Sequence, residues 1–101
     1  MTAPLETGFG WPRVARRLLD DARLPLRATF TPSLEGRRES ERERLEETAR
    51  SILTTGNDSA TAAALFCHRN TIPNRVARFK DLTGIDLTVP EQAALLVVAW
   101  A

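Results

Sequence analysis

The sequence contains a single cysteine, a single histidine and no tyrosine. One cysteine cannot close an internal disulfide, which agrees with a reducing compartment such as the cytoplasm. The adjacent Cys67 and His68 are too few ligands for a zinc site, which takes four. No apolar run of about 18 residues could span a bilayer, and no segment has the charge and hydropathy order of a signal peptide. We therefore expect a cytoplasmic protein with no metal, no other cofactor and no membrane partner.

Catalytic motifs are missing as well. No glycine-rich phosphate loop, nucleophile elbow or metal-ligand spacing occurs in the chain. The acidic residues between Glu39 and Glu47 alternate with arginines, which is typical of a solvated helix face and not of a paired-carboxylate site. We expect a protein that is not an enzyme.

What is present is the composition of one ordinary folded domain. The chain has 101 residues, of which 43% are hydrophobic and 27% are charged. The net charge of +1 neither favours nor excludes a nucleic-acid partner, because the distribution of charge matters more than its sum. Between Cys67 and Lys80 there are four cations, one histidine and no acid. The positive charge is therefore concentrated in one segment.

The first third of the chain shows weak patterning. Residues 1–10 contain proline and glycine but no periodicity, which indicates a loose terminus. Residues 11–23 fit one amphipathic helix. Pro25 is expected to interrupt it, and Pro32, Ser33 and Gly36 indicate an irregular link. We expect residues 1–39 to form an N-terminal extension.

A stronger helix is predicted from Ser40, which has capping-box spacing with Glu43. Gly56 stands where a left-handed C-terminal cap is expected. The apolar residues between them recur at helical spacing and predict one buried face: Leu45, Ala49, Ile52 and Leu53.

Three further helices follow. Residues 57–59 are a cluster of N-cap types before a helix over residues 60–66, and residues 66–68 form a short connection. The next helix carries Ile72, Val76 and Phe79 on its core face and ends near Gly84. The last helix is predicted to start at Thr88 with a capping box to Glu91, and it is apolar nearly all round.

Three short helices with a tight turn between the second and the third are the helix-turn-helix arrangement. The third helix fits the major groove, and side chains in its first turns point at base edges. Arginine can bond guanine through two hydrogen bonds, asparagine can bond adenine in the same way, and threonine can offer its methyl group to thymine. The predicted contacts in this segment are His68, Arg69, Asn70, Thr71, Asn74 and Arg75.

Phosphate contacts are predicted on both sides of these residues. Arg78 and Lys80 lie further along the third helix, where side chains position a protein without reading sequence. Ser59 and Thr61 begin the preceding helix and can donate to a phosphate beside its positive end.

The stretch SATAAALFCHRNTIPNRVARFKDLTGIDLTVPEQ resembles the C-terminal helix-turn-helix of PucR-type bacterial transcription regulators, which are related to the CdaR-type sugar-diacid regulators. More distantly it is similar to the Fis-type DNA-binding domain. The most specific part is HRNTI followed by Arg75, Val76 and then LTGIDL. The resemblance extends over about residues 45–101. It implies a DNA-binding transcription regulator, usually dimeric, whose longer relatives carry sensory domains upstream.

One departure from the family pattern changes the expected helix start. The family commonly places a basic residue and then an aromatic after Asn-Thr-aliphatic, where this chain has Pro73 and Asn74. With Asn70 as the cap, Pro73 falls at the third helical position, where a missing amide is tolerated. We therefore predict a recognition helix over about residues 70–82.

Together these patterns predict an all-α protein, with a tri-helical DNA-binding core, an extra N-terminal helix and a hydrophobic C-terminal helix in a domain over residues 40–101. The expected partners are double-stranded DNA and a second copy of the chain, because helix-turn-helix proteins usually read two half-sites. No complete sensor domain fits in residues 1–40, so no small-molecule effector is expected to bind here. The alternative is a degenerate helix-turn-helix that serves protein interaction or dimerisation without binding DNA.

Overall fold

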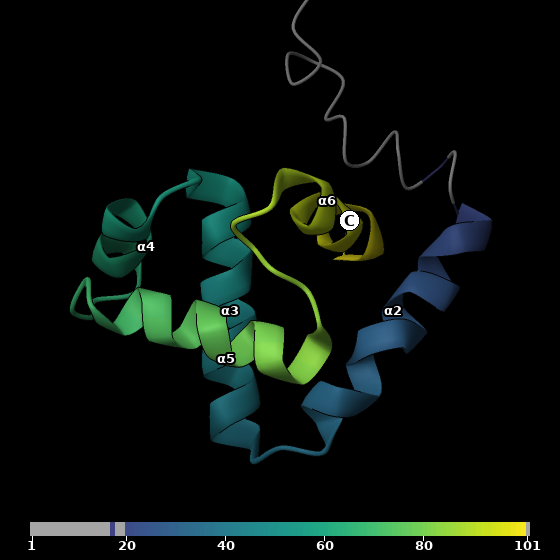
Figure 1. Ribbon diagram of the computed structural model, residues 1–101, viewed down its shortest axis with the longest axis horizontal. Coiled ribbons are helices and arrows are strands. Elements are labelled where there is room, and N and C mark those ends of the chain that lie inside the picture. Colours follow the sequence, from purple (N-terminus) through teal and green to yellow (C-terminus); the bar gives the residue numbers. More distant parts are fainter. Residues whose placement is uncertain (1–16, 18–19, 101) are drawn as a thin grey trace, which may run out of the picture.

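The computed structural model describes residue 17 and residues 20–100, and all regular secondary structure in this part of the chain is helical (Figure 1). The predicted all-α class is therefore confirmed. The expectations for residues 1–10, and for most of the predicted helix over residues 11–23, fall outside the described residues. The helices are α2 (Asp20–Glu35), α3 (Glu39–Thr55), α4 (Asp58–Ala64), α5 (Thr71–Thr83) and α6 (Pro90–Trp100).

The first described helix, α2, is longer than the sequence predicts. The expected break at Pro25 and the irregular link around Pro32 are wrong, because α2 runs through both prolines. A proline inside a helix removes a backbone hydrogen bond and crowds the preceding turn, so packing has to stabilise this one. α2 packs against α5 and α6, and it buries Leu34 in the common core. The link to α3 is reduced to residues 36–38.

For α3, the predicted C-terminal end is confirmed, whereas the predicted N-terminal cap is not. The expected capping box of Ser40 and Glu43 is wrong, because the helix already starts at Glu39 and Ser40 lies within its first turn. The N-cap is Arg38, which makes no side-chain capping bond. The C-terminal end is as predicted, with Gly56 in the left-handed conformation at φ 77°.

One hydrophobic core joins all five helices. Figure 1 shows α5 crossing α3, and it turns Ile72, Val76 and Phe79 inward, as predicted. Ala49 of α3 and Ala62 of α4 are also buried, and such small side chains let helices approach closely. The remaining buried apolar residues are Leu34, Leu45, Ile85, Leu87, Leu96 and Ala99.

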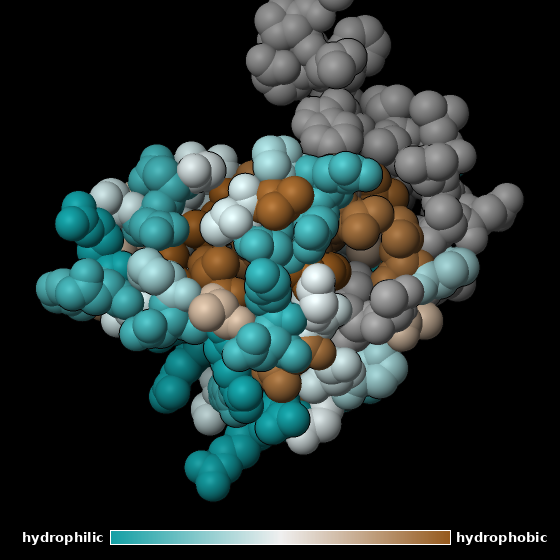
Figure 2. Space-filling model, in the orientation of Figure 1, coloured by the Kyte–Doolittle hydropathy of each residue, from teal (hydrophilic) through white to brown (hydrophobic). Residues whose placement is uncertain are grey.

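The C-terminal helix is fastened to this core through Trp100. The Trp100 ring meets the Phe79 ring edge-on, with 6.3 Å between centroids and 76° between planes. On α3, the Arg50 guanidinium carbon lies 4.3 Å from the centroid of the same ring, an attractive cation–π arrangement. Trp100 therefore links α6 to both α3 and α5. Brown, hydrophobic side chains are gathered around α6 in Figure 2.

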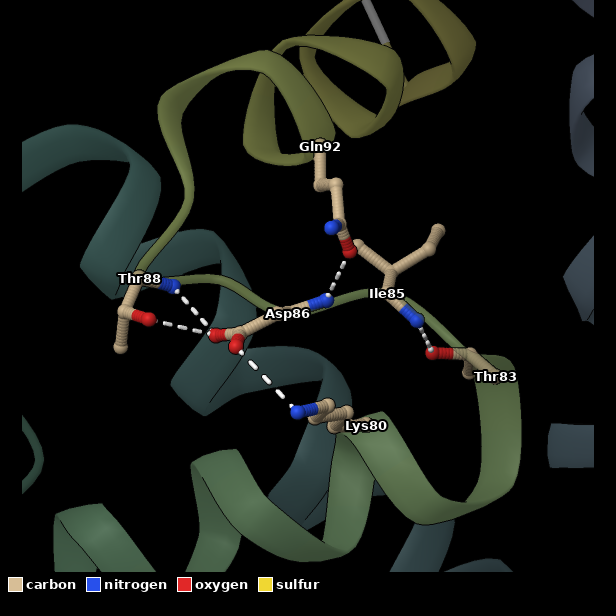
Figure 3. Close-up of polar contacts among 6 residues, drawn as sticks. All are labelled: Lys80, Thr83, Ile85, Asp86, Thr88 and Gln92. Carbon is tan, nitrogen blue, oxygen red and sulfur yellow. Dashed lines mark hydrogen bonds and ion pairs between the residues drawn. The ribbon is translucent and has the colours of Figure 1, made fainter.

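Asp86 holds the connection between α5 and α6 in place (Figure 3). Its Oδ1 accepts hydrogen bonds from the Thr88 amide at 2.9 Å and the Thr88 hydroxyl at 2.6 Å. Its own amide donates to the side-chain oxygen of Gln92 at 2.7 Å. The bonds from Thr88, helped by the Lys80 ammonium 3.5 Å away, lower the pKa of the Asp86 carboxyl. Lys80, which we expected at a phosphate, is thus directed toward this connection.

The start of α6 corrects one more prediction. The expected capping box of Thr88 and Glu91 is wrong, because the Thr88 hydroxyl donates to Asp86 and the helix begins only at Pro90. Pro90 lies in the first turn, as predicted, where its missing amide costs no hydrogen bond.

Candidate nucleic-acid interface

The turn between α4 and α5 spans residues 65–70 and is longer than predicted, because α4 already ends at Ala64. The Phe66 amide donates to the carbonyl of Ala63 at 3.4 Å, and the Cys67 amide donates to that of Ala62 at 3.0 Å. This pair of bonds is the Schellman arrangement that closes a helix C-terminus. The turn therefore has a defined backbone shape.

The recognition helix starts where the sequence predicts, with Asn70 as N-cap and Thr71 as the first helical residue. The capping chemistry differs, because the Asn70 side chain makes no capping bond. Its backbone amide donates to Nδ1 of His68 at 3.1 Å, and the Thr71 amide donates to the His68 carbonyl at 2.9 Å. His68 therefore closes the start of α5, and the Asn70 side chain stays exposed.

The two phosphate-contact candidates on α4 have different surroundings. Ser59 is exposed. Thr61 is fully buried, and its hydroxyl shares a hydrogen bond of 2.9 Å with the Thr55 hydroxyl. A phosphate contact through the Thr61 side chain is therefore wrong. The predicted capping of this helix is confirmed, because Oδ1 of Asn57 accepts from the Ala60 amide at 2.7 Å.

The segment from Ser59 to Lys80 exposes mainly polar side chains at the start of α5, although Phe66 in the turn is exposed as well. No acidic residue occurs between Asp58 and Asp81. Ala77 is exposed on α5, and its methyl-sized side chain leaves the backbone accessible to a close-fitting groove. The predicted contact residues that the structure leaves exposed or half-buried here are His68, Arg69, Asn70, Thr71 and Asn74.

The two arginines within α5 are held by α3. Nε of Arg78 donates to Oε1 of Glu41 at 2.8 Å. Nη1 of Arg75 donates to the Thr48 hydroxyl at 3.3 Å and lies 3.9 Å from Oε1 of Glu47. The Arg75 side chain is only 21% exposed, compared with 44% for Arg78. Both cations predicted to meet DNA are therefore engaged within the fold, Arg75 more firmly.

The Glu41–Arg78 pair also sets the charge on its carboxylate. The hydrogen bond from Arg78 lowers the pKa of the Glu41 carboxyl against a smaller opposing effect of desolvation. The positive charges of Arg78, Arg37 and Arg38 act in the same direction as that bond. At neutral pH the Glu41 side chain is thus an anion placed beside the recognition helix.

A groove runs between α3 and α5, and it adds a cation that the sequence reasoning missed. Arg44 is exposed and lines this groove. In the sequence Arg44 belongs to a run of alternating charges, so only the crossing of the two helices brings it near the outward face of α5. The other residues lining the groove are Glu41, Leu45, Thr71, Asn74, Arg75 and Arg78.

A tri-helical unit of α3, α4 and α5 with a closed turn and a polar third helix defines a helix-turn-helix protein. The family model described as the PucR C-terminal helix-turn-helix domain matches residues 45–101. The chain belongs to this family, as the resemblance of its sequence predicted. The family is one of DNA-binding regulators, and membership indicates a role that is not enzymatic.

The other comparisons add no further relatives, since no significant match to a curated protein or to a solved structure was found. Within residues 20–100, no helix is long and apolar enough to cross a membrane. The same part of the chain brings together no group of three or more side chains that could hold a metal ion.

Proposed function

We propose that the chain is a transcription regulator that binds duplex DNA sequence-specifically, with α5 in the major groove, through the unit formed by residues 40–101. The observation that carries the proposal is the row of exposed polar side chains at the start of α5, in a segment without acids and in a member of this family. An α-helix fits the major groove, and the first turns of such a helix reach the base edges.

The exposed side chains suggest separate roles. The Arg69 side chain has no partner among the described residues, so it is free to bond a guanine with two hydrogen bonds. Asn70 and Asn74 are spaced by four residues and lie on one side of the helix, where they can read adenines. Thr71 and His68 complete this row. Ser59, exposed in the first turn of α4, is assigned to a phosphate.

The arginines of α5 are assigned to the phosphate backbone. Arg78 is nearly half exposed and can exchange Glu41 for a phosphate by rotating its side chain. Arg75 is bound to both Thr48 and Glu47, so its main contribution is to hold α5 against α3. Positioning contacts of this kind carry affinity and register, not sequence information.

We assign this function to a dimer in the cytoplasm, because helix-turn-helix proteins usually bind two half-sites about one helical turn apart. Leu95 on α6 and Val89 just before it remain exposed, at 42% and 36%, and offer apolar surface to a second copy. A mass of two chains in gel filtration at micromolar concentration is the expected result. A mass of one chain would contradict the dimer without touching the DNA-binding proposal.

A protein-interaction module is the second candidate function. The observation that favours it is the engagement of Arg75 and Arg78 by acids of α3, which reduces the positive charge offered to DNA. The salt dependence of binding separates the two functions, because displacing counterions from phosphates makes affinity fall steeply as salt rises.

The test is fluorescence anisotropy with a duplex enriched from a random-sequence library on the wild-type protein. A length of about 20 base pairs accommodates two half-sites. We expect micromolar or tighter binding that weakens with salt. The Arg69→Ala variant should bind at least about fivefold more weakly, since a bidentate guanine contact is worth about 1–3 kcal/mol.

The matched control is Arg27→Ala, which also removes an exposed arginine, but from α2, the helix at the opposite side of the molecule from the α4–α5 turn (Figure 1). This variant should bind like the wild type. Circular dichroism establishes that each variant is folded. Failure of the folded wild type to bind any duplex at low salt would reject the proposal and favour the interaction module.

A further inference from the structure

Phe66 is unusual both in its surroundings and in its backbone. Its side chain is 97% exposed, so it adds nothing to the hydrophobic core. Its φ is 54°, and it is the one non-glycine residue with positive φ in the described part of the chain. L-residues avoid this region because Cβ approaches the following carbonyl oxygen.

The other helix ends show what the fold itself requires. α3 and α5 both end in the left-handed conformation, at Gly56 with φ 77° and Gly84 with φ 78°. Phe66 occupies the equivalent position in the Schellman arrangement that closes α4, where glycine is the usual residue. Replacing glycine by phenylalanine there adds backbone strain and exposes an aromatic ring to water. Neither effect stabilises the protein, so we look for the role of the ring outside the fold.

The backbone of the turn that carries the ring is fixed at both ends. Backbone hydrogen bonds from Phe66 and Cys67 to α4 fix the turn on one side. The bond from the Asn70 amide to His68 fixes it on the other. Because this turn leads directly into α5, Phe66 lies only four residues before Asn70, the N-cap of the helix that we propose to enter the groove. The nearest charged residue in sequence is Arg69, which is exposed, and the segment 59–80 contains no acid, so the turn itself offers only positive charge to a polyanion.

We propose that Phe66 makes an apolar contact with duplex DNA at the edge of the major groove, next to the bases faced by Arg69 and Asn70. The contact is with a thymine methyl group or with a deoxyribose, the two apolar groups that a duplex offers there. This inference rests on the proposed function. The left-handed backbone is then retained because it directs the ring away from the core and toward the DNA.

Two substitutions at Phe66 separate the effect of the aromatic ring on DNA binding from the effect of the left-handed backbone on stability. Phe66→Ala removes the ring and keeps a Cβ in the left-handed region, whereas Phe66→Gly removes both. With the enriched duplex, both variants should bind about tenfold more weakly than the wild type, the loss expected when most of an aromatic contact disappears. Phe66→Gly should at the same time unfold at a higher urea concentration than the wild type, which shows that its weaker binding does not come from misfolding.

Uracil substitution in the duplex identifies the group that is touched. If the ring meets a thymine methyl, replacing that thymine by uracil weakens the wild type but has no further effect on Phe66→Ala. If the ring meets a deoxyribose, only the protein substitutions matter. Either result supports the contact.

Wild-type affinity in both folded variants would overturn the inference while leaving the proposed function intact. A folded wild type that binds no duplex would overturn the proposed function and this inference with it. The two failures are thus distinguished by the wild-type measurement alone.

Discussion

Replacing Glu41 by glutamine should strengthen DNA binding, although Glu41 itself lies on α3. In the free protein the Glu41 carboxylate accepts a 2.8 Å hydrogen bond from Arg78. A phosphate that recruits Arg78 has to displace this internal anion. In Glu41→Gln the competing negative charge is gone, so Arg78 becomes available as a phosphate contact without a preceding exchange.

The size of the effect follows from counterion release. Each additional phosphate neutralised by a cation steepens the slope of log K against log salt by about 0.9. Over a roughly fourfold rise in salt, one such contact makes a difference of about 3.5-fold in affinity. We therefore expect Glu41→Gln to bind more tightly than the wild type at low salt and to lose this advantage as salt rises.

The control is Glu43→Gln, which removes the same charge from the same helix. Glu43 is exposed and has no ion pair among the described residues, so its loss changes the overall charge equally without releasing an arginine. Anisotropy titrations at several salt concentrations should give a steeper slope for Glu41→Gln alone. Equal slopes and equal affinities for the two variants would refute the reasoning, because the gain would then come from overall charge.

Two further predictions concern stability. Asn57→Ala should lower the free energy of unfolding by about 1 kcal/mol, because the Ala60 amide loses its hydrogen-bond acceptor. Asn57→Asp should retain most of the wild-type stability, because aspartate also caps helices well. Urea denaturation followed by circular dichroism measures both variants. Because the hydrogen bond from Arg78 lowers the pKa of Glu41, the pair stabilises the fold above the ordinary pKa of glutamate. That stabilisation disappears as the pH falls through the lowered pKa of Glu41 in the folded protein. The urea midpoints of the wild type and of Glu41→Gln should therefore differ at neutral pH and converge in acid.

Helices whose sequence matches the helical period were predictable from the sequence. Ile72, Val76 and Phe79 recur at the spacing of one helix face, and all three are buried. The ends marked by Gly56 and Gly84 were predictable for a local reason as well, since only glycine adopts positive φ without strain. In these segments local preference and tertiary packing agree.

Predictions failed where a residue had more than one available partner. Thr88 has capping-box spacing with Glu91, but its hydroxyl donates to Asp86, which lies closer along the chain. Pro25 and Pro32 normally end helices, yet α2 continues through both because α5 and α6 pack against it. The packing that sustains α2 is not visible in a local pattern, and the spacing of Thr88 alone does not decide between Asp86 and Glu91 as its partner.

In the candidate site, too, local features were predictable from the sequence, whereas features that depend on tertiary contacts were not. The polar residues of HRNT could be identified by type, and the structure leaves them exposed. What the sequence could not reveal is which cations are already occupied, because the bonds from Arg75 and Arg78 reach residues 27 and 37 positions away. The burial of Thr61 depends in the same way on the packing of α4 against α3 and α5.

Pro73 is the departure from the family pattern that most affects the recognition helix, and the backbone explains why α5 tolerates it. Pro73 is the third residue of α5, and the amides of a helix's first turn have no carbonyl partner within the helix. A proline, which has no amide to donate, therefore removes no helical hydrogen bond at this position. The ring also fixes φ near the helical value at the third position of α5. The proline therefore preserves the helix while replacing a side chain that the family usually makes basic. Under the proposed function, its effect is expected on the DNA sequence that is preferred and not on the formation of the recognition helix.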